Sequence, residues 1–97
     1  MKTPLDPRHK KRQHIVEELF ALAFANQRSS EKAQQIYEQK QFIDEQIRKA
    51  ATEFPIDKIN KIDLAILRLA VFELLLEKTQ PQKVIIDEAI ELAKEYG

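Results

Sequence analysis

Cationic side chains are concentrated at the beginning of the chain, and their types suit the binding of a polyanion. The first 14 residues contain one carboxylate, that of Asp6, and five cations: Lys2, Arg8, Lys10, Lys11 and Arg12. Lysine and arginine bind nucleic acids mainly by neutralising phosphates. These cations fall at an expected helix N-terminus, where positive charge is unfavourable, so helix stability does not explain them. The alternative is a solvated surface, and charge alone does not decide between the two.

Other arrangements of reactive side chains are weaker. His9 and His14 are five residues apart, whereas two ligands on one helical face need a spacing of three or four. The chain contains no cysteine, which excludes disulfides and thiol chemistry. No spacing supports a Ser-His-Asp arrangement or places two carboxylates in one pocket. We therefore expect a protein that is not an enzyme, with no catalytic residues, no metal site and no cofactor.

Composition predicts one all-α domain. The single glycine is Gly97, although all-β folds and phosphate-binding loops need turn glycines. Charged residues make up 33% of the chain and hydrophobic residues 43%. Ninety-seven residues suit a single domain, which we assign to residues 1–97 with a flexible lead-in over residues 1–7. No apolar segment follows Lys2, so we expect a cytoplasmic protein that does not associate with a membrane.

The segment Ile62–Leu76 predicts a central helix. Twelve of its fifteen residues are apolar, and its three charges, Asp63, Arg68 and Glu73, are five residues apart. Five steps of about 100° turn a helix by about 140°, so these charges cannot share one polar face. We expect this helix to be surrounded by protein, with four residues almost fully buried: Leu67, Leu69, Ala70 and Leu74. Arg68 then needs a carboxylate partner, because an unpaired buried charge is costly. The candidates are Asp63, Glu73, Asp87 and Glu88.

Capping residues and apolar spacing predict the remaining elements. Asp6 and Pro7 favour the start of a helix that runs to about Asn26. Ser29 or Ser30 caps a second helical region that extends to Phe54, with a break near residues 39–41 as the alternative to one long helix. A short helical turn over residues 56–60 leads into the central helix, which ends near Lys78. A last helix follows residues 79–82, with Asp87 and Glu88 near its N-terminus and Gly97 after its end.

Two motifs in the second half carry a family resemblance. The sequence IDLAILRLAVFELL is followed by a proline-containing loop and by KVIIDEAIELAKEYG, and together they resemble the NusB family. The resemblance is specific over residues 54–97 and weaker over residues 8–24. In the weaker part, this chain has Leu19 and Phe20 where family members often have leucine followed by tyrosine. One departure is Asp87, where family members usually have asparagine.

The resemblance implies an all-helical fold of two small bundles and a non-enzymatic protein that binds single-stranded boxA RNA. It also implies a protein partner, the ribosomal protein NusE. The surface of this chain that would bind NusE includes the position of Asp63. By position, Arg8, Lys10, Lys11 and Arg12 would contact RNA. Phe20 and Tyr37 are candidates for stacking on bases. Packing in the core is the alternative for both, and it is the expectation for Phe24.

The family continues past the position of Gly97 with a further helix. We therefore expect a bundle of about five helices that lacks it, with apolar faces exposed on the last two helices and weak homodimerisation as a result. The functional prediction is a NusB-type factor in transcription antitermination. The alternatives are a NusB-like module in ribosomal RNA processing or modification and a helical protein-interaction module without RNA binding.

Overall fold

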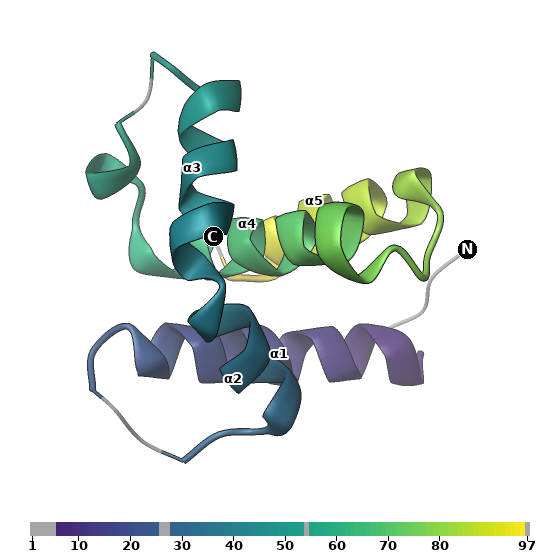
Figure 1. Cartoon of the computed structure of the whole chain (residues 1–97). Helices are drawn as coiled ribbons and strands as arrows, with labels where there is room; N and C mark the ends of the chain where they lie inside the picture. The colour runs from purple at the N-terminus through teal and green to yellow at the C-terminus, as the bar shows by residue number, and fades with distance from the viewer. Residues whose placement is uncertain (1–5, 26–27, 54, 97) are drawn as a thin grey trace.

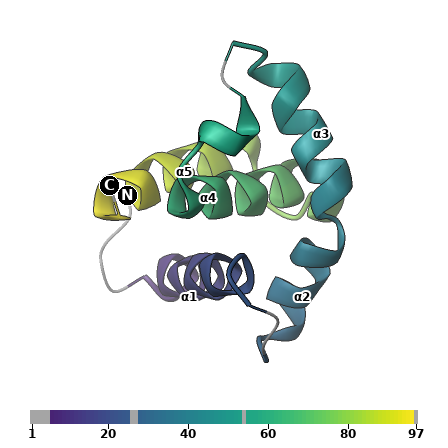
Figure 2. The same cartoon turned by 90° about the vertical axis from the view of Figure 1, so that its left-hand side faces the viewer.

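The computed structural model describes residues 6–25, 28–53 and 55–96. The predicted all-α fold is confirmed: five α-helices and two short helical segments make up the described elements, and none of them is a strand. In both views α4 and α5 lie side by side and α1 runs beneath them (Figures 1 and 2), and Figure 2 shows α2 and α3 together along one side of the molecule. The described residues contain no helix that is long and apolar enough to cross a membrane.

Helix α1 spans Pro7–Leu22 and begins as predicted. The Asp6 carboxylate accepts a hydrogen bond from the backbone N–H of Arg8 (2.9 Å), and Pro7 occupies the first helical position. The predicted end near Asn26 is wrong, because the helix stops at Leu22 and a turn follows. Asn26 lies outside the described residues, as do residues 1–5 of the predicted lead-in.

The second helical region is divided, as one of the two alternatives predicted. Helix α2 spans Glu31–Glu38, and the Ser30 side chain caps it by accepting from the Ala33 N–H at 3.2 Å. Helix α3 spans Lys40–Ala50, and Gln39 forms the break between the two helices. The predicted end at Phe54 lies outside the described residues. The predicted short turn is present as the 3₁₀ helix η1, Ile56–Lys58.

Helix α4 spans Lys61–Val71 and is central, with contacts to α1, α3 and α5. It continues directly into a π-helical segment, η2, over Phe72–Glu77. The backbone N–H of Lys78 donates to the carbonyl of Glu73 (2.9 Å), five residues earlier. Lys78 takes a left-handed conformation (φ 57°), which ends the helix near the predicted residue.

The last helix, α5, spans Gln82–Tyr96, so the predicted N-terminus near Asp87 and Glu88 is wrong. The helix begins at the residue after Pro81, whose carbonyl accepts from the Ile85 N–H (3.2 Å). The β-branched residues that precede Asp87 lie within this helix, and one of them, Ile85, is buried. Glu88 is buried in the middle of the helix and is available for internal pairing.

The core lies where α1, α3 and α5 meet α4, and two predictions about it are wrong. Leu69 is buried as predicted (2% exposed), but Leu67 is 36% exposed, and Ala70 and Leu74 are only partly buried. Helix α4 is therefore covered on most sides but not on the side that carries Leu67. Phe24 follows the end of α1 and is 63% exposed rather than in the core.

Candidate nucleic-acid interface

Three exposed cations form a basic turn at the start of α1: Arg8, Lys10 and Lys11. Arg8 is partly neutralised by Asp6, whose carboxylate oxygen lies 3.8 Å from its Nε. In the described part of the chain, Lys10 and Lys11 form no ion pair. The basic turn therefore presents uncompensated positive charge to solvent, as the capture of phosphates requires.

Arg12 does not belong to this surface, so the prediction that it contacts RNA has to be corrected. Its side chain is buried, and Nε and Nη2 each donate to one carboxylate oxygen of Glu73 at 2.8 Å. Its Nη1 also lies 3.4 Å from Glu88 Oε1. The physical reason is helical periodicity, since Arg12 shares the inner face of α1 with Val16 and Leu19. Its five donors serve the interior of the protein and are unavailable to a phosphate.

His9 lies on the same buried side of α1 and is 3% exposed. Its Nδ1 lies 2.9 Å from Glu88 Oε1, and its Nε2 lies 2.7 Å from Glu95 Oε2. Burial disfavours the charged imidazole, but the hydrogen bonds to both carboxylates outweigh it and raise the pKa of His9 above its ordinary value. Gln13 Nε2 donates to the other Glu95 oxygen at 2.9 Å and completes the contacts of that carboxylate.

We call five side chains the buried charge cluster: the buried His9, Arg12, Glu73 and Glu88, and Glu95 at its exposed edge. It joins α1 to η2 and α5, elements that lie far apart in the sequence. Sequence reasoning missed it by treating residues 8–12 as one basic run. The three-residue spacing of His9 and Arg12, continued by Ile15, Val16 and Leu19, was the signal that could have separated the buried cations from the exposed ones.

Arg68 has a structural ion pair, as its burial required, but all four predicted partners are wrong. Its Nε and Nη2 donate to the two carboxylate oxygens of Asp44 on α3, at 2.9 and 2.8 Å. Glu73 and Glu88 are committed to Arg12 and His9. Asp87 lies 3.1 Å from Lys83 on the surface of α5. Asp44 was not considered, because the long-range placement of α3 beside α4 is not visible in local spacing.

The aromatic candidates lie away from the basic turn. Phe20 is exposed and meets Phe24 edge-on, with ring centroids 4.9 Å apart. Phe20 follows Arg8 by twelve residues, which corresponds to about 18 Å along the helix. Tyr37 is half-buried on α2, and Lys40 Nζ lies 4.2 Å from its ring centroid and donates to its hydroxyl at 3.0 Å. The structure therefore exposes Phe20 but does not bring it or Tyr37 into one site with the three cations.

Asp63, the predicted partner-binding residue, is half-buried in the first turn of α4. Its backbone N–H donates to the side-chain oxygen of Asn60 at 2.8 Å, and its carboxylate accepts from the Asn60 amide at 3.0 Å. These reciprocal bonds cap the helix, so Asp63 has a structural role whether or not a partner contacts it.

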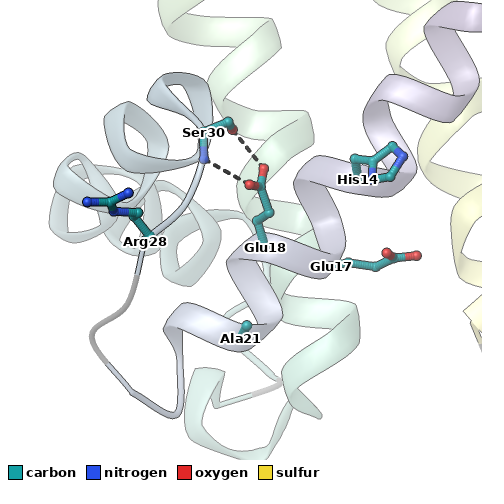
Figure 3. Close-up of a pocket in the computed structure, with 6 residues that line it drawn as sticks. All are labelled: His14, Glu17, Glu18, Ala21, Arg28 and Ser30. Carbon is teal, nitrogen blue, oxygen red and sulfur yellow. Dashed lines mark hydrogen bonds between the residues drawn. The ribbon is translucent and has the colours of Figure 1, made fainter.

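A pocket of about 430 Å³ lies between α1 and the segment that leads into α2 (Figure 3). Its lining residues are His14, Glu17, Glu18, Ala21, Arg28 and Ser30. Glu18 points across it and accepts from the backbone N–H and the hydroxyl of Ser30, at 2.8 and 2.7 Å (Figure 3). Glu17 accepts from the Tyr96 hydroxyl at 2.6 Å. Two carboxylates make this pocket unfavourable for a phosphate, and no set of side chains in the described residues suits a metal ion.

The different burial of Arg12 and Lys11 predicts opposite effects of truncation on stability. Arg12→Ala leaves the buried Glu73 carboxylate without its bidentate partner, and we expect the free energy of unfolding to fall by about 3–5 kcal/mol. The matched variant Lys11→Ala removes an exposed charge one residue away and should change it by less than about 0.5 kcal/mol. Urea unfolding followed by circular dichroism measures both. Equal small effects would mean that the buried charge cluster does not support the fold.

Comparison with known proteins identifies the family. The model of the NusB family matches residues 9–97. A protein of Dehalococcoides mccartyi strain 195 is 45% identical over 62 residues, which cover 64% of this chain and 43% of the relative. A protein of Clostridium botulinum strain Kyoto is 48% identical over 62 residues, which also cover 64% of this chain and 43% of the relative. A protein of Chloroflexus aggregans is 41% identical over 63 residues, which cover 63% of this chain and 42% of that protein.

All three relatives are named transcription antitermination protein NusB. The aligned part of the chain spans less than half of the length of each of them. No solved structure matches the chain significantly. The family match runs from His9, in the first turn of α1, to Gly97, so it includes the two lysines of the basic turn and the central helix. This chain therefore belongs to the NusB family.

Proposed function

We propose that this chain is an RNA-binding factor in transcription antitermination, which captures boxA-like single-stranded RNA on the basic turn of α1. The observation that carries the proposal is the uncompensated exposure of Lys10 and Lys11 on a helix of a NusB-family chain. The names of its relatives support the process but specify neither RNA nor a partner protein.

The mechanism that we propose is the displacement of counterions from RNA phosphates by Arg8, Lys10 and Lys11. Such contacts fix the position of the strand without reading its sequence. The buried charge cluster contributes indirectly, because it holds the same two turns of α1 against α5 and η2. Cations on an anchored helix lose less conformational entropy on binding than cations on a mobile segment.

Sequence preference then has to come from stacking or from contacts to base edges. Phe20 is the better placed candidate, because its ring is exposed beside that of Phe24. Tyr37 offers only a half-buried ring, one face of which is approached by Lys40. A strand that reached Phe20 from the basic turn would follow α1 for about 18 Å, a distance that several extended nucleotides can span.

We further propose that NusE binds at the surface that includes Asp63 and raises the affinity of the assembly for RNA. Asp63 lies at the start of α4, whereas the basic turn lies at the start of α1, so the two ligands would use separate surfaces. Ribosomal RNA processing by the same RNA-binding surface, and protein interaction without RNA, are the alternatives that the binding experiment has to separate.

The salt dependence of RNA binding tests the proposal. Three phosphate contacts predict a slope of log K against log salt of about −2.1, since each contact to a single strand contributes about −0.7. Replacing Lys10 and Lys11 together by alanine should bring the slope to about −0.7 and weaken the binding of boxA-like and scrambled RNA alike. Fluorescence anisotropy over a salt series, with and without NusE, measures both quantities.

The matched control is the double variant Lys49→Ala and Lys58→Ala, which removes the same charge from exposed positions on α3 and η1. It should bind RNA as the unaltered chain does. Equal slopes in both double variants would remove the basic turn from the mechanism. Absence of RNA binding above background, together with binding of NusE, would favour the protein-interaction module. A preference for other ribosomal RNA segments over boxA would favour RNA processing.

We also propose weak self-association through apolar residues on the last two helices. Ile86 and Ile90 are 46% and 50% exposed and lie one turn apart on α5. Leu67, Leu75 and Leu76 are exposed on α4 and η2. Exposed apolar patches of this kind favour contact with a second copy.

Sedimentation velocity over a concentration series should show a monomer–dimer equilibrium that Ile86→Gln with Ile90→Gln shifts toward monomer. Gln82→Ala, an exposed polar position on the same helix, is the control and should leave the equilibrium unchanged. A strict monomer at millimolar concentration would exclude this contact.

A further inference from the structure

The two ring nitrogens of His9 both face carboxylate oxygens. Nδ1 lies 2.9 Å from Glu88 Oε1 and Nε2 lies 2.7 Å from Glu95 Oε2, from two positions on α5 that are seven residues apart. A neutral imidazole carries one N–H and one lone pair, so it could donate to only one of these carboxylates and would oppose its lone pair to the other. Only the imidazolium ion donates to both. The geometry therefore matches the protonated state of His9 when both carboxylates are ionised.

The charges around His9 strengthen this requirement. Glu88 and Glu95 reach it from α5, Glu73 from η2 lies behind Arg12, and Asp6 caps the helix that carries it. Arg12 is the one other cation in the buried charge cluster, and Glu73 takes up two of its donors. With a neutral His9 the cluster holds one cation against three carboxylates, two of them buried. Loss of the proton thus leaves one hydrogen bond, from a neutral donor to a carboxylate, and sets the lone pair of the other ring nitrogen against the second carboxylate.

We propose that His9 is a pH-sensitive latch, whose imidazolium fastens the first two turns of α1 to α5 and whose deprotonation releases them. Resting on the proposed function, this latch also governs RNA capture, because Lys10 and Lys11 lie on the same turns. Release of the latch disorders the cations that the phosphates contact and lowers affinity for RNA. From Ile15 to Leu22 the buried side chains of α1 are apolar and do not titrate, and the hydrogen bonds of Glu17 to Tyr96 and of Glu18 to Ser30 do not involve His9. We therefore expect the change to be confined to the start of the helix.

The direction of the pH effect follows from the raised pKa of His9. A group whose pKa is higher in the folded than in the released state contributes its full stabilisation below the released-state pKa. The contribution disappears as the pH rises through the folded-state pKa. The pKa of Glu95 is lowered. Burial acts to raise this pKa, but the hydrogen bonds from Gln13 and His9 outweigh burial and lower it. Glu95 is therefore already ionised in mildly acidic solution, and the latch is closed from there up to the pKa of His9.

The reference for the titration of His9 is the ordinary pKa of a histidine side chain, about 6.5. Proton NMR of the assigned His9 imidazole ring between pH 5 and pH 10 should show it titrating above that value. Amide hydrogen exchange, measured at the same pH values, should show protection factors of residues 10–13 falling as His9 loses its proton. Those of residues 64–70 in α4 should stay constant. Each unit by which the pKa of His9 in the closed state exceeds its pKa in the released state corresponds to a tenfold drop in protection.

Two variants separate the latch from general effects of pH. In His9→Gln the side chain at position 9 is uncharged at every pH, so protection of residues 10–13 should be low and independent of pH. In the control His14→Gln the pH-dependent drop should persist. A third variant, Glu95→Gln, removes one partner and should move the titration of His9 to lower pH. The latch is excluded if His9 titrates in the unaltered chain at or below the ordinary histidine pKa of about 6.5, a result that needs no variant to fold. It is also excluded if the protection of residues 10–13 does not change with the charge of His9.

RNA affinity forms the last arm of the test and keeps the two proposals distinguishable. At constant ionic strength, affinity for a boxA-like oligonucleotide should fall across the titration of His9 in His14→Gln and should show no such step in the His9→Gln, His14→Gln double variant. A pH-dependent protection change with no RNA binding at any pH would uphold the latch and reject the proposed function. RNA binding whose affinity shows no step at the titration of His9 would reject the latch as a regulator of that binding.

Discussion

The bidentate pair between Arg12 and Glu73 is the contact on which the arrangement of the other elements depends. It joins the first helix to the π-helical segment 61 residues later, and both side chains are buried. Taking two charges out of water costs several kcal/mol for each ion, and the cost is recovered only with good geometry and satisfied hydrogen bonds. Here both carboxylate oxygens are bonded, and every buried side-chain nitrogen and oxygen among the described residues has a partner. The pair therefore selects one orientation of α1 with little tolerance for another.

This orientation divides the cations of the first helix into two groups with different tasks. The helix turns by about 100° per residue, so alternate members of one basic run face opposite sides. His9 and Arg12 face inward and hold α1 to α5 and η2, whereas Lys10 and Lys11 face solvent. The same physical constraint thus supplies both the anchor and the exposed charge. Glu73, the partner of Arg12, lies in the first turn of the π-helical segment.

Sequence reasoning predicted those features that depend on local chemistry. The caps at Asp6 and at Ser29 or Ser30 follow from the hydrogen-bonding capacity of those side chains, and Asp6 and Ser30 cap the two helices. The end near Lys78 follows from the polar, proline-containing stretch after it, whereas the break at Gln39 was one of two alternatives that local sequence left open. The all-α class followed from a chain whose one glycine is its last residue. The predictions that failed depended on which helices pack together. Arg68 pairs with Asp44 because α3 crosses α4, and Leu67 is exposed because no described element covers that side of α4. Of the four cations predicted to form the candidate RNA site, three are exposed. Arg12 was assigned to the site wrongly, because its position on the inner face of the helix was not taken into account.

A double-mutant cycle on Arg12 and Glu73 tests the central claim most directly. The free energy of unfolding is measured for the unaltered chain, for Arg12→Ala, for Glu73→Ala and for the double variant. If the pair anchors α1, the two effects are strongly non-additive, with a coupling energy of about 1–3 kcal/mol, because the second truncation removes a charge that the first has already left unpaired. Effects that add to within about 0.5 kcal/mol would show that the two residues act independently, and the account of α1 as a helix fixed by its buried charges would be wrong.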